Sequence, residues 1–173
     1  MSLPGARDAE PGAVLLHPLT LAFLALWIVN DHVLKAAYPG LVSGKLSDIA
    51  GVIVFPLLVL AGAELLGSTL SQRRRRAVLG CAVIATCSAM IAIKLFEPAA
   101  WFYREGLAAL QWPFYAALSA LRGSALPELR SVHLAMDPTD LLTLPSSCVA
   151  LWIAESTHKP ESHIRARSPS SVV

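Results

Sequence analysis

The residues best suited to chemistry lie in one stretch, from Asn30 to Gly51. Carboxylates, lysines, a histidine and serines occur there close together: Asp31, His32, Lys35, Lys45, Ser47 and Asp48. Carboxylates and histidine are common catalytic acids and bases, and histidine is the natural proton carrier near neutral pH. Of this stretch, the candidate catalytic residues are Asp31, His32 and Asp48.

The start of the stretch has a simpler interpretation as well. Asp31 and Lys35 are four residues apart, so on a helix they share a face and can form an ion pair. Such a pair contributes only about 0.2–0.5 kcal/mol in water and more when half-buried. We favour an ion pair at the end of a helix, while acid–base chemistry at Asp31 and His32 stays open as the alternative.

A second motif, Gly44-Lys45-Leu46-Ser47-Asp48, suggests an anion site. It is not a phosphate-binding loop, because residue 39 is proline and the spacing GxxxxGK[ST] is missing. A Gly-Lys-x-Ser turn at a helix N-terminus could still bind an anion such as a lipid phosphate. The alternative is a capped helix whose Lys45 extends to water.

Two further charges extend the candidate site. Lys94 closes a long apolar run, and Asp140 belongs to Asp137-Pro138-Thr139-Asp140, a sequence typical of a helix start with Asp137 as its N-cap. By default Lys94 extends to water. If it turns inward, it would pair with Asp31, Asp48 or Asp140, and a lysine and several aspartates at one depth would form a buried polar network. The full prediction has these members: catalytic candidates Asp31, His32, Asp48 and Asp140, and ligand-binding residues Asn30, Lys35, Lys45, Ser47 and Lys94.

Neither a metal site nor a cofactor is predicted. His32 and His133 are suitable ligand types for a divalent ion, but the chain has no HExxH or CxxC motif. It also lacks a GxSxG elbow and a dinucleotide fingerprint. The cofactor, if any, stays unknown.

The composition predicts the environment of this chemistry. Of the 173 residues, 55% are hydrophobic and only 15% are charged, against about a quarter in soluble domains. The mean hydropathy is +0.58. We therefore predict an all-α, multi-pass membrane protein whose partners are membrane lipids, with a second copy or another membrane protein left open. The net charge of +2 indicates no nucleic-acid partner.

The apolar runs predict one transmembrane domain over residues 13–155. Four spans are expected, at about 13–30, 49–67, 77–96 and 139–155. The aromatic-rich segment 99–122 is predicted to lie in the interface or to be re-entrant, as aromatic girdles do. Disordered tails are expected at 1–12 and 156–173, and the first run is taken as a retained span because no basic region precedes it.

The ends of the first two spans are predicted from their breakers and caps. Tyr38-Pro39-Gly40 should end the first helix, since proline and glycine together break helices. Ser43 and Gly44 should keep the connection irregular, and Ser47 or Asp48 should cap the second helix.

The four arginines Arg73–Arg76 predict the topology. Positive residues prefer the cytoplasmic side, so this loop and both termini are expected there, in agreement with Arg7, Lys159, Arg165 and Arg167. The stretch 30–48, Lys94 and Asp140 then fall together on the extracytoplasmic side. The same arginines could contact anionic lipid. A fifth span at 106–121 would send the C-terminus outward.

Three motifs resemble those of a set of uncharacterised bacterial multi-pass membrane proteins. They are NDHxLK, PGxxxGKLSDxxG and a late DPTDL, and they cover the first two predicted spans and the start of the last. The resemblance implies a location in the bacterial inner membrane. It assigns no catalytic residue.

Three functions remain open at this point. The leading one is an integral membrane protein whose extracytoplasmic polar cluster is structural and binds a polar or anionic ligand such as a lipid headgroup. The first alternative is a membrane-embedded hydrolase or transferase acting on a lipid-linked substrate. The second is a small proton-coupled transporter that uses the carboxylates as a relay.

Overall fold

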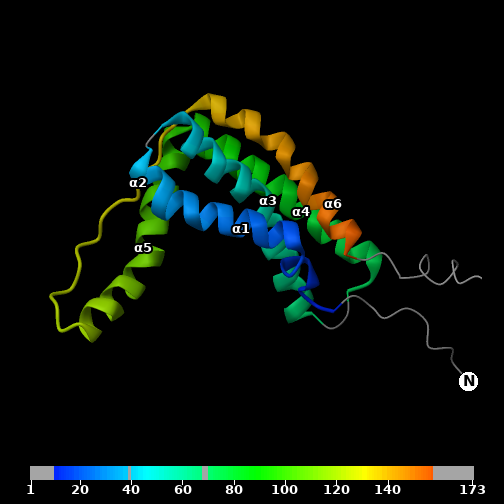
Figure 1. Cartoon of the computed structure of the whole chain (residues 1–173), viewed down its shortest axis with the longest axis horizontal. Helices are drawn as coiled ribbons and strands as arrows, with labels where there is room; N and C mark the ends of the chain where they lie inside the picture. The colour runs from blue at the N-terminus through cyan, green and yellow to red at the C-terminus, as the bar shows by residue number, and fades with distance from the viewer. Residues whose placement is uncertain (1–9, 39, 68–69, 158–173) are drawn as a thin grey trace, which may run out of the picture. The chain divides into compact units, whose positions relative to one another are not determined.

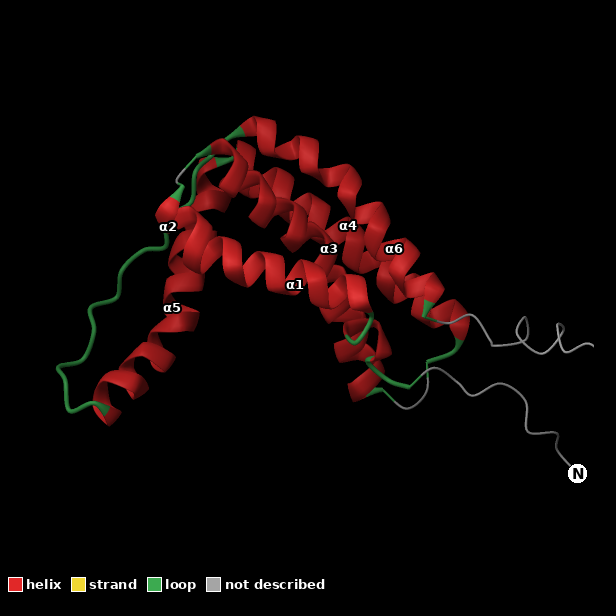
Figure 2. Ribbon diagram, viewed as in Figure 1, coloured by secondary structure: helices red, strands yellow, loops and turns green. Residues whose placement is uncertain are grey.

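The structure is a computed structural model that describes residues 10–38, 40–67 and 70–157. Within these ranges the chain forms helices and loops and no strand, which confirms the predicted all-α class (Figure 2). The chain divides into two compact units, Met1–Thr86 with Thr143–Val173, and Cys87–Leu142. Figure 1 draws the chain coloured by residue number. Most of the two predicted tails, and with them Arg7, Lys159, Arg165 and Arg167, lies outside the described residues.

The first unit begins with a 3-10 turn, η1 (Ala13–Leu15), followed by α1 (Pro18–Val29). Pro18 occupies the start of α1, where its missing N–H costs nothing. The helix continues as a π-helix, η2 (Asn30–Leu34), and a short α2 (Lys35–Ala37). The helical run therefore ends before Tyr38, as predicted.

The second helix, α3 (Leu41–Leu66), begins earlier than predicted. Ser43 and Gly44 are helical, and neither Ser47 nor Asp48 is the cap. The cause is Ser43, whose hydroxyl accepts a hydrogen bond from the backbone N–H of Gly40 and donates to the carbonyl of Tyr38. These two bonds satisfy backbone groups just before the helix, and α3 begins at Leu41, eight residues before the predicted start at 49.

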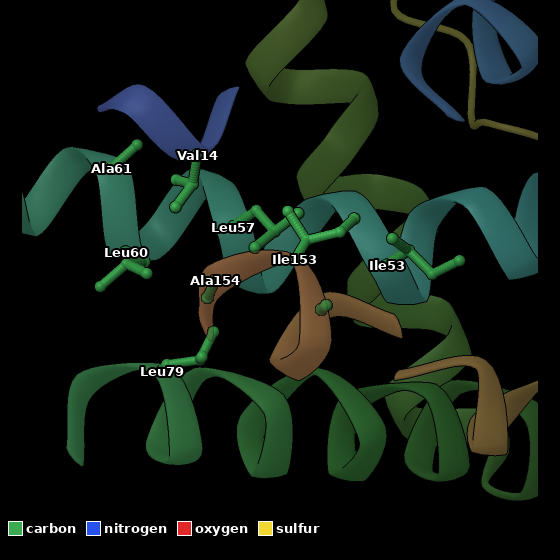
Figure 3. Close-up of a cluster of buried hydrophobic side chains, with 9 residues drawn as sticks. Val14, Ile53, Leu57, Leu60, Ala61, Leu79, Ile153 and Ala154 are labelled. Carbon is green, nitrogen blue, oxygen red and sulfur yellow. The ribbon is translucent and has the colours of Figure 1, made fainter. Parts of the chain in front are cut away.

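The core of the first unit forms around α3. Its side chains come from η1, α3, the first half of α4 (Gln72–Leu95) and α6 (Ser147–Ser156), as Figure 3 shows. Buried members include Val14, Ile53, Leu57, Leu79 and Ile153. α3 packs against both α1 and α6, so it is the central helix of this unit.

The second unit contains the end of α4 and the whole of α5 (Glu97–Leu121). The predicted segment 99–122 is helical as far as Leu121, as part of one continuous helix that includes Pro113. A loop leads from it to the 3-10 helix η3 (Pro138–Ser146), which continues into α6. The backbone N–H of Thr139 donates to the carboxylate of Asp137, so the predicted cap at this helix start is confirmed.

Two helices of the described chain are long and apolar enough to cross a membrane. They cover Val42–Leu66 and Gln72–Leu95, with mean hydropathies of 2.4 and 2.1, and Pro18–Leu34 is a shorter apolar helix. Length and composition are the basis of this assignment. Four spans were predicted; the described residues contain two helices of suitable length and composition, and the membrane crossing itself stays a prediction.

Candidate functional site

Asn30 is the buried residue that joins two helical segments in the polar stretch of the first unit. Its side chain is fully buried, and its amide nitrogen donates to the carbonyl of Ser43 and to the hydroxyl of Ser47, each at 2.6 Å. The residue opens the π-helix η2, a local widening that is often found where a helix carries a functional or structural polar group. Asn30 therefore links the first helical run to α3.

Ser47 extends this link to the charged residues. Its hydroxyl accepts from Asn30 and donates to a carboxylate oxygen of Asp31 at 2.5 Å. The ammonium group of Lys35 contacts the same Asp31 oxygen at 2.7 Å, one helical turn along. The result is a chain of hydrogen bonds in the order Asn30, Ser47, Asp31 and Lys35, and the predicted ion pair of Asp31 and Lys35 is present.

The environment of Asp31 disfavours its use as a base. Partial burial raises the pKa of its carboxyl, but hydrogen bonds from Lys35 and Ser47 and the positive charge of Lys35 outweigh it and hold the pKa below the ordinary value of 3.8. A carboxylate with a lowered pKa is a weak base. Ser47 is buried and already donates its proton, so this pair favours structure over nucleophilic attack.

The anion site predicted at Gly44–Ser47 does not have the expected geometry. Because α3 begins at Leu41, Lys45 lies beyond its first turn and Ser47 lies further in. The free backbone N–H groups that would bind an anion belong to the helix end, several residues earlier. The predicted helix start within this motif is therefore wrong, while binding of an anion by Lys45 and Ser47 stays a prediction.

The remaining residues of the stretch differ in exposure. His32 is exposed, whereas Lys45 and Asp48 are half-buried and each already has an interaction partner. In this stretch, one buried polar atom has no hydrogen-bond partner among the described residues, the side-chain oxygen of Asn30.

In the second unit, Lys94 and Asp140 form a buried ion pair. The ammonium group of Lys94 lies 2.5 Å from a carboxylate oxygen of Asp140 and 3.2 Å from the carbonyl of Ala135. Both side chains are almost fully buried. The pair ties the end of α4 to the start of η3, two segments 46 residues apart in sequence.

The predicted site residues thus divide into two groups. Asn30, Asp31, Lys35 and Ser47 are connected to one another in the first unit, and Lys94 and Asp140 are connected in the second. His133 is exposed in the second unit. A shared site of the two groups stays a prediction.

One polar centre was missed from the sequence. The guanidinium of Arg75 contacts Glu64 at 2.7 Å and donates to the carbonyl of Ala154 at 2.7 Å. The other carboxylate oxygen of Glu64 accepts from the backbone N–H of Gly12. Both charged side chains are buried, so this arginine is a structural residue of the run that was interpreted as a topology signal.

A clue to this ion pair is that an acidic residue and a run of arginines lie near the same short loop of the sequence. Glu64 lies in the last turn of one predicted span, and the arginines form the end of the short loop that precedes the next one. A single acid facing a run of bases across a short connection can form an ion pair, but the sequence does not say which arginine turns inward.

No group of three or more histidine, cysteine, aspartate or glutamate side chains gathers to hold a metal ion in the part of the chain that the structure describes. Comparison of the chain with protein-family models, with curated proteins and with solved structures finds no match. The arrangement of the side chains is therefore the basis for the function proposed below.

Proposed function

We propose that this chain is a multi-pass integral membrane protein of the bacterial inner membrane whose polar residues hold its helices together. The observation that carries the proposal is the outward-facing surface of the two long helices. Large apolar side chains are exposed along them: Phe55, Leu58, Val59, Leu65 and Leu66 on α3, and Ile84, Ile91 and Leu95 on α4. Soluble proteins rarely expose an apolar surface of that extent, whereas lipid favours it.

The alternative of a soluble core helix is less compatible with α4. A core helix of a soluble protein is buried on most sides, but only 22% of the most apolar window of Gln72–Leu95 is buried. With 24 residues this helix is about 36 Å long, enough for a hydrocarbon layer of about 30 Å. Contact with lipid explains its composition and its exposure together.

Two further spans complete the proposed topology. The first is the predicted run 13–30, which holds η1 and α1, so that Asp31, His32 and Lys35 follow its extracytoplasmic end. The last run, η3 and α6, has only 19 residues, but its nine 3-10 residues rise about 2 Å each and give it a contour length of about 33 Å. We assign α5, rich in exposed aromatic residues, to the interface.

The polar network of Asn30, Ser47, Asp31 and Lys35 supports a structural role over an enzymatic one. Its hydroxyl and its carboxylate are already bonded within the chain, and Asp31 has a lowered pKa. In lipid, polar groups that bond across helices stabilise their association. No observation specifically favours the hydrolase, transferase or transporter alternatives.

Cysteine labelling tests the proposal. His32 and Ser71 are exposed, and they lie in the segments before and after α3, a helix about 39 Å long. In a background without the native cysteines, H32C should react with a membrane-impermeant maleimide in whole cells, and S71C should react only after the cells are opened. The protein should also stay in the membrane pellet at alkaline pH.

Labelling of both positions from outside, or release of the protein into the alkaline supernatant, would contradict the proposal. A Cys-free parent that carries no introduced cysteine controls for background labelling.

A further inference from the structure

A pocket in the second unit lies between α5 and the loop that follows it. Its volume is about 320 Å³, at the lower end of the range of small-ligand sites, about 300–1,000 Å³. The helix contributes Gln111, Trp112 and Tyr115, and the loop contributes Glu128 and Arg130. The pocket therefore combines aromatic rings with one acidic and one basic side chain.

Local contacts hold the loop beside the helix. At the end of α5 the backbone N–H of Ser124 donates to the carbonyl of Ser119, as in a Schellman turn. Gly123 lies inside this turn with a φ of 66°, a conformation that glycine adopts without strain. Beyond the turn, the indole N–H of Trp112 donates to the carbonyl of Pro127 at 2.9 Å. The turn and this hydrogen bond together preform the pocket.

The charged side chains that line the pocket are Glu128 and Arg130. Their carboxylate and guanidinium groups are 3.7 Å apart, and the two side chains are 83% and 85% exposed. An ion pair this exposed contributes little stability, so each partner can turn to a ligand at little cost. Opposite charges at this spacing carry no net charge together. They fit a ligand that has both a cationic and an anionic group, rather than an anion alone.

The aromatic rings provide a second contact for a cation. Trp112 is half-buried and Tyr115 is exposed, and they lie three residues apart on one face of α5. The ring faces of tryptophan and tyrosine attract ammonium groups. With Glu128 from the loop, the pocket offers an ammonium group a carboxylate as well as two aromatic rings.

Apolar side chains around the pocket favour a lipid as the ligand. Phe114 and Leu118 are exposed on α5, and Leu126 and Leu129 are exposed on the loop. Leu129 also lines the pocket itself. A small soluble zwitterion would leave this apolar surface in water, whereas the acyl chains of a lipid would cover it.

We infer that this pocket binds the headgroup of a zwitterionic aminophospholipid. The ammonium group lies at Glu128 and the rings of Trp112 and Tyr115, and the phosphate lies at Arg130. The inference rests on the proposed membrane location of the chain and on the assignment of α5 to the interface. It is independent of the polar network around Asn30, which belongs to the first unit.

Quenching of Trp112 tests the inference. In the full chain with Trp27, Trp101 and Trp152 changed to phenylalanine, Trp112 is the remaining tryptophan. This parent protein is placed in phosphatidylglycerol vesicles that contain an equal mole fraction of either brominated phosphatidylethanolamine or brominated phosphatidylglycerol. The brominated phosphatidylethanolamine should quench Trp112 more strongly, because it alone supplies the ammonium group.

The variant E128Q/R130Q should lose this preference. Each exposed ion pair contributes at most a factor of about five in affinity, so the preference of the parent should not exceed about 25-fold and should fall to about one in the variant. The matched control E97Q/R104Q removes another ion pair of the same unit and should keep the preference. Circular dichroism checks that the parent and both variants keep their helices.

The outcomes separate this site from the proposed function. Equal quenching by the two lipids in the parent, or an unchanged preference in E128Q/R130Q, would overturn the headgroup site while leaving the membrane location intact. Displacement of the brominated lipid by glycerophosphoethanolamine, which has no acyl chains, would overturn the choice of a lipid. The absence of quenching by either lipid would overturn both the site and the interfacial position of α5.

Discussion

At the scale of single residues, Ser47 decides how the polar stretch is to be understood. Its hydroxyl accepts from Asn30 and donates to Asp31, so both its hydrogen-bonding functions are used within the chain. A buried hydroxyl in this position stabilises helix packing, because leaving either partner unsatisfied costs about 1–3 kcal/mol. The same residue in an open loop would have been a candidate for ligand binding.

Asp31 gives the protein a pH-dependent contribution to stability. Burial raises the pKa of its carboxyl, but the hydrogen bonds from Lys35 and Ser47 and the charge of Lys35 lower it further, to below 3.8. The folded state therefore binds this proton less readily than the unfolded state. The stabilisation is present above about pH 4 and is lost as the pH falls through the folded pKa.

We expect the melting temperature of the wild type in detergent to exceed that of D31N at pH 6, with the difference shrinking toward pH 3. The effect should be modest because the Asp31 side chain is 36% exposed. The control E128Q removes a negative charge at a side chain that is 83% exposed and should follow the wild type throughout. A difference between wild type and D31N that grows on acidification would refute this assignment.

At the scale of helices, the ends of α3 are each held by a polar contact. Ser43 caps its start and allows it to begin at Leu41, and Glu64 holds its end to α4 through Arg75. Arg75 also reaches the carbonyl of Ala154 at the end of α6. A single buried guanidinium thus connects the ends of the helices that form the core.

Breaking this connection should be costly. Removing one partner of a buried ion pair leaves an uncompensated charge and typically costs about 3–5 kcal/mol. We expect R75M and E64Q each to lower the free energy of unfolding by that order, and the double variant R75M/E64Q to lose clearly less than the sum. Unfolding by SDS titration in mixed micelles measures all three.

The matched control is R74M, which changes an exposed arginine one position away and should alter stability by no more than about 0.5 kcal/mol. Strict additivity of R75M and E64Q would show that the two side chains do not interact in the folded protein.

At the scale of the whole molecule, the outward apolar side chains determine whether water or lipid suits the surface of the protein. Ile84 lies near the middle of α4 and is 68% exposed. In water such a residue can be exchanged for lysine freely, whereas a lysine at the centre of a membrane span costs about 2.5–3.5 kcal/mol of insertion free energy. One substitution therefore distinguishes the two environments.

We expect I84K to reduce the fraction of the protein in the alkali-resistant membrane pellet. S71K introduces the same charge at an exposed position next to the first turn of α4 and should insert like the wild type. An I84K protein with wild-type insertion, or one recovered mainly in soluble form, would argue that α4 faces water.

The sequence alone predicted the helical class, the break after Ala37, the ion pair of Asp31 and Lys35 and the cap at Asp137. These features depend on composition, on hydropathy and on contacts between residues at most four positions apart, and such local effects are visible in a linear sequence. The membrane environment and the four spans follow from the same reasoning and stay predictions.

Only the tertiary structure decided where α3 begins, which arginine is buried and what Lys94 and Asp140 contact. Ser43 can extend α3 to Leu41 because its hydroxyl meets the backbone of the preceding break, and Arg75 turns inward because Glu64 and Ala154 lie beside it. The partners of Arg75 and Lys94 are distant in sequence, up to 79 residues apart. Packing of several helices brings them together, and no local pattern encodes that choice.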